Sequence, residues 1–420
     1  MDHELRKRGT TNEASAAPVQ PARRRAALAF IFVTVMLDML ALGMMIPVLP
    51  KLVERFMDGN TAAAAEVFGL FNTVWALMQF LCSPVLGALS DRYGRRPVIL
   101  LSNFGLGLDY VLMALAPTLG WLFVGRVISG MTAASIPTAY AYIADVTPSE
   151  RRAKAYGLLG AAFGMGFILG PALGGVLGAI EPRLPFWVAA AFSLANALYG
   201  LIVLPESLAP EQRRQFSWRR ANPIGSLTLL RSHPELFGLA ATNFLVNLSH
   251  VVFPSVFVLY AGYRYGWDEG MVGLTMAAFG LSSIIVQAGL VGPVVKKFGE
   301  RRALLIGLLF GTAGLAIFGL APSGVAFLIG LPVMALWGFA NPAAQGLMTR
   351  RVSPAEQGQL QGANSSIMGI ANLVGPAIFS LTFAHAIAAA GGALVGAPFL
   401  LSALMLLASA ALAWHATRPR

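Results

Sequence analysis

The chain has 420 residues, of which 56% are hydrophobic and only 12% are charged, and its mean hydropathy is +0.68. So few polar side chains cannot cover a globule of this size in water, which excludes a single soluble domain and indicates a protein with many membrane-spanning segments. The net charge of +11 suggests a nucleic-acid partner, but the basic residues do not cluster on a recognisable nucleic-acid-binding module.

The first 26 residues are polar, rich in alanine and proline, and contain three consecutive arginines at positions 23–25. We interpret residues 1–26 as a disordered cytoplasmic tail. The first apolar run begins at Leu28 and is too long for the core of a signal peptide, and it lacks a small-residue cleavage site. We therefore expect this segment to stay in the protein as its first membrane helix.

Apolar runs of about 20 residues, the length that crosses a bilayer, predict twelve transmembrane helices. Their approximate ranges are 28–50, 67–89, 98–117, 120–142, 155–180, 186–205, 236–261, 270–294, 303–320, 325–348, 359–386 and 393–416. The predicted fold class is an all-α membrane protein with both chain ends on the same side.

The distribution of basic residues supports this topology. With twelve helices, 25 of the 30 Lys and Arg residues fall on the side of the chain ends, and the opposite loops hold only Lys51, Arg55, Arg183 and Arg264. Basic residues concentrate in cytoplasmic loops, so both termini are predicted to be cytoplasmic. The same distribution accounts for the pI of about 10.2 without nucleic acid.

The chain divides into two halves of six helices. A polar, arginine-containing segment at 206–234 is the predicted cytoplasmic linker between six-helix bundles at 27–205 and 235–420. Five sequence markers recur at an offset of 205 residues: Gly87 and Gly292, Gly94 and Gly299, Arg96 and Arg301, Gly157 and Gly362, and Gly170-Pro171 and Gly375-Pro376. A shift of six helices preserves orientation, so the repeat is parallel, and a binding cavity is expected between the halves near the middle of the membrane.

Only three charged residues lie inside the predicted helices: Asp38, Asp109 and Arg126. Such residues are costly in hydrocarbon and mark ion or substrate paths by default. Their depths along the helices permit mutual contact, and two carboxylates then share one guanidinium. We expect proton coupling here, with protonation of Asp38 releasing Arg126 and Asp109 tuning or sharing the site; the alternative is a static buried ion pair.

Two further patterns concern conformational change. The loop between the second and third helices contains Gly87, Asp91, Arg92, Gly94, Arg95 and Arg96, and its repeat at 292–302 favours a paired hinge over an ordinary basic loop. In the fifth helix, Gly166, Gly170 and Gly174 recur every four residues and leave one face bare for close helix packing. Plain packing and a mechanistic role are both compatible with that face.

These motifs resemble the major facilitator superfamily, and specifically its tetracycline-resistance-like branch of drug:proton antiporters. The resemblance rests on the segment 87–96, on Leu37-Asp38, Asp109-Tyr110 and Gly125-Arg126, on the segment 141–148, and on Gly375-Pro376. It implies a gating role for the loop together with Asp145, a bacterial inner membrane, and an antiporter motif formed by Gly166, Gly170, Pro171, Gly174 and Gly175.

The chain departs from that branch at one position. Tetracycline exporters of the branch carry an aspartate in the ninth helix, eleven residues after the glutamate of the Gly-Glu loop. Counting from Glu300 leads to Gly311. This departure argues against tetracycline as the substrate, although the resemblance keeps it among the candidates.

Uncharged polar residues line up on several helices and are candidates for a substrate cavity. They are Asn72 and Gln79 on the second helix, Asn243, Asn247 and His250 on the seventh, Gln287 on the eighth, and Asn341 and Gln345 on the tenth. Amides with aromatic neighbours suit a neutral or zwitterionic, partly apolar ligand. Interhelical hydrogen bonding is the alternative for each residue.

The leading hypothesis is therefore proton-coupled efflux of a small amphipathic compound by alternating access of the two halves. The alternative is a proton symporter or facilitator for a small metabolite. A receptor or scaffold is disfavoured because no large extramembrane domain is predicted, and an enzyme because the common catalytic and phosphate-binding motifs are missing. The lone Cys82 allows no intramolecular disulfide. We predict no cofactor, metal or obligate protein partner; protons, the bilayer and a small molecule are the expected partners.

Overall fold

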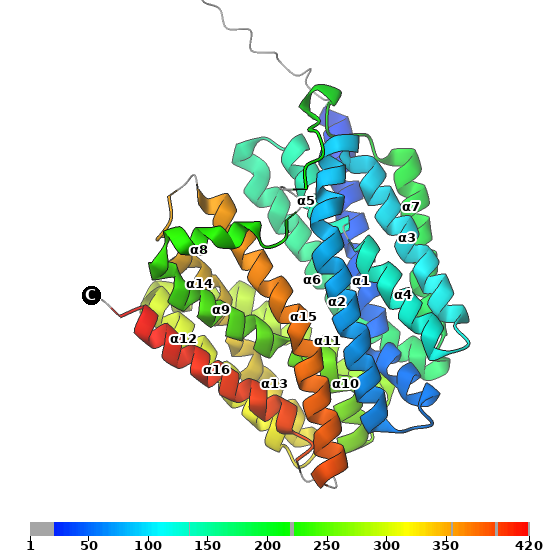
Figure 1. The fold of residues 1–420 in the computed structure, drawn as a ribbon, viewed down its shortest axis with the longest axis vertical. Helices are drawn as coiled ribbons and strands as arrows, with labels where there is room; N and C mark the ends of the chain where they lie inside the picture. The colour runs from blue at the N-terminus through cyan, green and yellow to red at the C-terminus, as the bar shows by residue number, and fades with distance from the viewer. Residues whose placement is uncertain (1–20, 134, 219–221, 354–355, 391–393, 419–420) are drawn as a thin grey trace, which may run out of the picture.

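A computed structural model describes residues 21–133, 135–218, 222–353, 356–390 and 394–418. Two helical bundles lie side by side in it (Figure 1). The first contains α1 (Pro21–Phe56), α2 (Thr61–Tyr93), α3 (Arg95–Leu115), α4 (Leu119–Thr132), α5 (Ser135–Val146), α6 (Ser149–Ile180) and α7 (Leu184–Val203).

The second bundle contains α9 (Phe237–His250), α10 (Val252–Tyr265), α11 (Glu269–Ile285), the π-helical turn η4 (Val286–Leu290), α12 (Val291–Leu320), α13 (Gly324–Ala335), η5 (Leu336–Phe339), α14 (Ala340–Thr349), α15 (Gln357–Ala390) and α16 (Ala397–Ala416). Between the bundles, the linker forms short helical turns: η1 (Pro210–Gln212), η2 (Gly225–Thr228), α8 (Leu229–Ser232) and η3 (Pro234–Leu236).

The expected twelve crossings arise from helices that are partly interrupted or fused. The described residues contain eleven continuous stretches long and apolar enough to cross a membrane, and one of them, Glu269–Leu320, has 52 residues. At 1.5 Å per residue a straight helix of that length would be far longer than the ~30 Å hydrocarbon core. Its non-helical residue, Gly299, marks the turn between two crossings. The predicted all-α architecture of twelve helices in two halves is confirmed.

Some predicted boundaries shift. The fourth predicted helix is divided into α4 and α5, and the seventh into α9 and α10. Of the predicted tail, residues 1–20 lie outside the described residues, and α1 already begins at Pro21.

The internal repeat is visible in the backbone. Gly94 and Gly299, which are related by the 205-residue offset, both have positive φ, with φ/ψ of 108/163° and 76/162°. Each precedes a repeated arginine that reaches the end of the last helix of its own half. Arg96 Nη2 donates to the Leu201 carbonyl (2.6 Å), and Arg301 Nε donates to Thr417 Oγ1 (3.1 Å).

The two halves meet mainly at the side opposite the linker. In Figure 1 they diverge toward the end where the linker lies and converge at the other end. α2 packs against α15 and α6 against α11 across this interface. Arg55 Nη2 and Glu269 Oε1 are 3.3 Å apart, and a Cβ at Gly69 would lie 2.8 Å from Ser380 Oγ. The structure therefore corresponds to a state that is closed on the side opposite the linker.

Candidate functional site

Arg126 and the two buried acids lie inside the first bundle. Asp38 on α1, Asp109 on α3 and Arg126 on α4 are 4%, 0% and 7% exposed. A Cβ at Gly125 would lie 2.8 Å from Asp109 Oδ1, so this carboxylate packs against the turn that carries Arg126, and the two charges interact electrostatically. The ring of Tyr110 lies in the field of all three charges, which places Asp38 in the same region.

The side chain of Arg126 is held by residues of α2. Its Nη2 donates to Asn72 Oδ1 (3.3 Å), and its Cζ lies 5.2 Å from the ring centroid of Trp75. The Trp75 indole N–H in turn donates to Ser129 Oγ (3.2 Å), one turn after Arg126 on α4. Arg126 Nε has no hydrogen-bond partner among the described residues. The guanidinium thus keeps an unused donor.

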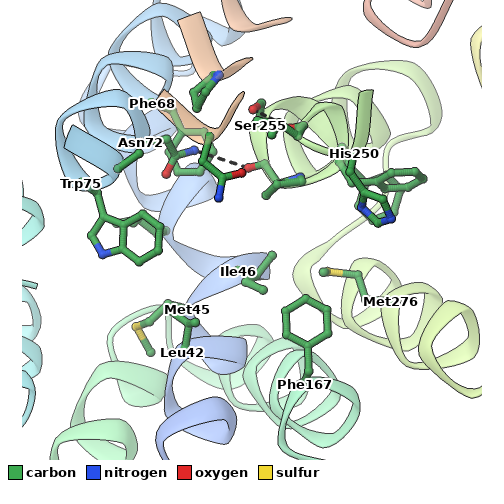
Figure 2. A pocket seen from close by; sticks show the side chains of 18 of the residues that line it. Leu42, Met45, Ile46, Phe68, Asn72, Trp75, Phe167, His250, Ser255 and Met276 are labelled. Carbon is green, nitrogen blue, oxygen red and sulfur yellow. Dashed lines mark hydrogen bonds between the residues drawn. The ribbon is translucent and has the colours of Figure 1, made fainter. Parts of the chain in front are cut away.

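A cavity of about 420 Å³ lies between the halves and includes Arg126 in its wall. Figure 2 shows Trp75 and His250 on opposite sides of it, with Ile46 between them and Met276 on the side of His250. The other lining residues are mostly apolar: Leu42, Met45, Leu49, Phe68, Asn72, Ala76, Asn247, Val251, Phe253, Pro254, Ser255, Phe257, Thr275, Phe279, Leu331, Met368, Asn372 and Pro376.

The ionisable residues of the cavity wall are basic. Among the described lining residues only Arg126 and His250 are ionisable, and none is an acid. Asp38 and Asp109 lie behind the wall, since Leu42, one helical turn after Asp38, reaches the cavity and the carboxyl groups do not line it. A ligand in the cavity therefore meets the guanidinium directly and the acids only through it.

The predicted polar candidates divide into two groups. Asn72, Asn247 and His250 line the cavity, whereas Gln79, Asn243, Gln287, Asn341 and Gln345 are not among its lining residues. Asn243 and Gln345 belong to a series of hydrogen bonds that ends at Asn247 in the cavity wall. In this series Asn247 Nδ2 donates to Asn243 Oδ1 (2.9 Å), Asn243 Nδ2 to Asn364 Oδ1 (3.1 Å), and Asn364 Nδ2 to Gln345 Oε1 (2.9 Å).

Arg95, the first residue of α3, is the centre of an ion-pair cluster at the junction of α2 and α3. It forms ion pairs with Asp91 (2.5 Å) and with Asp145 on α5 (3.0 Å), and Asp145 also accepts a hydrogen bond from Ser207 Oγ (3.0 Å). Gly87 and Arg92 belong to the same end of α2, where Arg92 lies over the ring of Tyr93. The cluster ties α2, α3 and α5 to the start of the linker.

Glu206 is a member of this cluster that the sequence did not suggest. Its carboxylate accepts hydrogen bonds from the backbone N–H groups of Arg95 (2.8 Å) and Arg96 (3.2 Å) at the start of α3. An acid at a helix N-terminus satisfies free N–H groups and complements the helix dipole. The contact joins residues more than 100 positions apart, so no local sequence pattern predicts it.

The glycines of α6 serve two different interfaces. A Cβ at Gly170 would lie 2.7 Å from Gly43 Cα on α1, and Gly166 and Gly174 face the same helix. Gly175 instead faces α11 of the other half, where a Cβ would lie 3.1 Å from Gly273 Cα. Pro171 is close to Gly43 and, through its carbonyl, to Gly273. Bare backbone permits both approaches.

Two six-helix halves around a central cavity, with a buried acid and guanidinium beside it, define a membrane transporter. The family model "Major Facilitator Superfamily" matches residues 31–376 and 239–420. The chain is 38% identical to the tetracycline resistance protein, class C, of Escherichia coli, covering 85% of this chain and 90% of that protein. It is 30% identical to multidrug resistance protein 2 of Bacillus subtilis (strain 168), covering 82% and 85%.

The fold agrees with these matches. A bacterial homologue of the human lysosomal transporter Spinster, solved in an inward-facing, occupied conformation, superimposes with a TM-score of 0.76 at 16% identity, covering 95% of this chain and 98% of that one. The chain belongs to the Major Facilitator Superfamily and to its tetracycline-resistance-like branch. It is a multi-pass membrane transporter of small molecules and not an enzyme.

Proposed function

We propose that the chain exports a small amphipathic, drug-like compound in exchange for protons. The observation that carries the proposal is the position of Arg126, which interacts with buried Asp109 on one side and lines the cavity on the other. A change in the charge of the acids alters the field on Arg126, and Arg126 transmits that change to a ligand in the cavity. The relatives named for tetracycline and multidrug resistance support the drug class.

Coupling requires that protonation and ligand binding influence one another. In our proposal Asp38 and Asp109 carry the proton, because the protonation state of a buried carboxyl group depends on the charges around it. Protonation of Asp38 then frees Arg126. The loop around Arg95 and the glycines of α6 then govern which side is open. Both termini face the cytoplasm of a cell with an inner membrane, and neither a cofactor nor an obligate protein partner takes part.

Tetracycline is one candidate substrate, but Gly311 separates this chain from the branch's pattern. A Cβ at Gly311 would lie 2.8 Å from Trp337 Cγ and 2.9 Å from Leu406 Cδ1, so the position holds no acid and has no room for one without rearrangement. A drug-susceptibility panel in an efflux-deficient host, with tetracycline as one member, compares the intact chain with Asp38→Asn. Resistance to at least one compound, lost in Asp38→Asn, is expected.

Proteoliposomes test the coupling directly. An imposed pH gradient should drive transport of the compound found in the panel, and Asp38→Asn should abolish gradient-driven transport while leaving ligand binding measurable. Asp58→Asn is the matched control, because Asp58 lies in the exposed turn after α1 with φ of 53°, which asparagine tolerates. Full gradient-driven transport by Asp38→Asn, or transport only in the direction of uptake, would contradict the proposal.

A further inference from the structure

Gly311 on α12 lies beside Trp337, which stacks on His250. The ring of Trp337 on η5 occupies the space beside Gly311, and Trp337 is only 5% exposed. The imidazole of His250 stacks on this indole, with ring centroids 4.5 Å apart and an interplanar angle of 27°. His250 lines the cavity, whereas Trp337 is not a lining residue. The indole therefore packs against the imidazole without lining the cavity itself.

We propose that His250 is the specificity-determining residue of the second half, that Trp337 and Gly311 position it, and that the site takes planar aromatic compounds with oxygen acceptors at two edges. The inference rests on the proposed function and names the substrate class of the same cavity. Trp337 can lie where it does because residue 311 has no side chain, so a glycine in this place fixes the orientation of a histidine that faces the ligand.

The chemistry of the cavity wall defines the ligand. Two hydrogen-bond donors belong to the wall of this mostly apolar cavity: the guanidinium of Arg126, and the imidazole of His250, one of whose nitrogens carries a proton in either neutral tautomer. Trp75, whose ring centroid is 5.2 Å from Arg126 Cζ, and His250 lie on opposite sides of the cavity (Figure 2). Donors on both walls match carbonyl or phenolic oxygens at opposite edges of a ring system. A permanent organic cation meets no carboxylate among the described lining residues and faces Arg126 instead.

Three tricyclic probes of similar size test this inference with the full-length protein in detergent. 9,10-Anthraquinone has a carbonyl at each of two opposite edges, anthracene has none, and N-methylacridinium is a permanent cation. Equilibrium dialysis against protein-free micelles measures each affinity at one pH without a gradient. Only anthraquinone can accept a hydrogen bond at both edges, so it should bind at least about tenfold more tightly than either other probe.

Variants assign the preference to His250. We expect His250→Ala to weaken anthraquinone binding about five- to tenfold and anthracene binding much less, and His250→Gln, which keeps a donor, to recover part of the loss. Gly311→Ala should reproduce the His250→Ala result without altering a lining residue, because its Cβ displaces Trp337. Gly292→Ala is the matched control on α12, since a Cβ there has no neighbour within 4 Å. Met276→Leu, an apolar change in the wall, should affect all three probes alike.

Several outcomes would overturn the inference. They are failure of anthraquinone to bind, equal or tighter binding of N-methylacridinium, an unchanged probe order in His250→Ala, and an unchanged anthraquinone affinity in Gly311→Ala. Trp337→Phe, which keeps a stacked ring, guards against a folding defect and should retain the order with a smaller difference. Because no proton gradient is used, these results are independent of the Asp38→Asn transport test, and either proposal can fail alone.

Discussion

Arg55 of the first half and Glu269 of the second form an ion pair across the side opposite the linker, with Arg55 Nη2 3.3 Å from Glu269 Oε1. Arg55 is more than half exposed, so the pair contributes at most about 1 kcal/mol. Loss of that energy should shift the equilibrium between closed and open states of this side by up to about fivefold. We predict such a shift toward the open state in Glu269→Gln.

Spin labels at Glu66 and Tyr263, in a Cys82→Ser background, report the separation of the two halves on this side. The long-distance population should grow in Glu269→Gln. Glu181→Gln serves as the control, because Glu181 accepts its hydrogen bond from Arg183 within the same half (2.8 Å). An identical distance distribution in Glu269→Gln and the parent would show that the ion pair does not hold this side closed.

Gly175 and Gly273 allow α6 and α11 to cross at backbone contact. A Cβ at Gly175 would lie 3.1 Å from Gly273 Cα, and it would also press on the Glu269 carbonyl. Overpacking of this kind typically costs about 1–3 kcal/mol, and here the cost falls on the closed state alone. Gly175→Ala should therefore open the side opposite the linker more strongly than Glu269→Gln does.

The same helix offers a control for Gly175→Ala. A Cβ at Gly164 on α6 has no neighbour within 4 Å. Gly164→Ala should leave the distance distribution unchanged and slightly raise thermal stability, because alanine is favoured over glycine in a helix by up to about 1 kcal/mol. If both variants open the protein equally, helix propensity and not the crossing is responsible.

The number and direction of the helices could be predicted because length, apolar runs and basic residues act locally. Gly94 and Gly299 illustrate this: the repeat marked both from the sequence, and both adopt a backbone conformation that only glycine readily reaches. The fused stretch that contains Gly299 was not predicted as continuous, because the apolar runs on either side of it are separated by charged residues.

The cavity wall could be predicted only in part, since it depends on helix rotation and on contacts between distant residues. Asn243 and Asn247 share a helix face, yet Asn247 lines the cavity and Asn243 bonds to Asn364 of α15. Trp337 supports His250 from another helix, and Glu206 caps α3 from beyond α7. Such pairings are set by packing in three dimensions, and periodicity along one helix does not reveal them.

The paired glycines of the repeat yield a further prediction. At both Gly94 and Gly299 alanine is strained, at a cost of about 1–3 kcal/mol. At Gly94 a Cβ would also come within 2.6 Å of Glu206 Cδ and would break the cap on α3, whereas nothing lies within 4 Å of a Cβ at Gly299. Gly94→Ala should therefore lower the unfolding temperature and the transport rate more than Gly299→Ala.

Thermal unfolding of the purified variants measures this difference. Glu206→Ala alone should lower the unfolding temperature, and adding Gly94→Ala to it should cost about as much as Gly299→Ala costs in the parent. Additive losses from Gly94→Ala and Glu206→Ala would instead mean that the two residues do not act through one contact.

A pH-dependent contact joins the linker to the second half. His233 Nδ1 is 2.8 Å from Glu235 Oε1, and its Nε2 is 3.0 Å from Glu356 Oε1 just before α15. Two hydrogen bonds raise the pKa of His233 above 6.5; the bond to Glu356 has the larger effect and the bond to Glu235 the smaller one. Hydrogen bonds from His233 and Ser353 lower the pKa of Glu356 from 4.5 to about 2.

The signs of these shifts fix the pH window of the contact. A raised pKa of His233 means that its stabilising contribution is complete below pH 6.5 and is lost as the pH rises through the raised value. A lowered pKa of Glu356 means that its contribution is present above pH 4.5 and is lost as the pH falls toward about 2. The linker should therefore be held most firmly between about pH 4.5 and 6.5.

Hydrogen–deuterium exchange of residues 229–236 checks this window. After correction for the intrinsic rate, exchange should be slower at pH 6 than at pH 8.5, and His233→Gln should make the corrected rates nearly equal at the two values. His415→Gln is the control, because His415 lies at the end of α16 and is not part of this contact. Since these side chains are partly exposed, added salt should weaken the effect. A pH difference that persists in His233→Gln would assign the effect to another group.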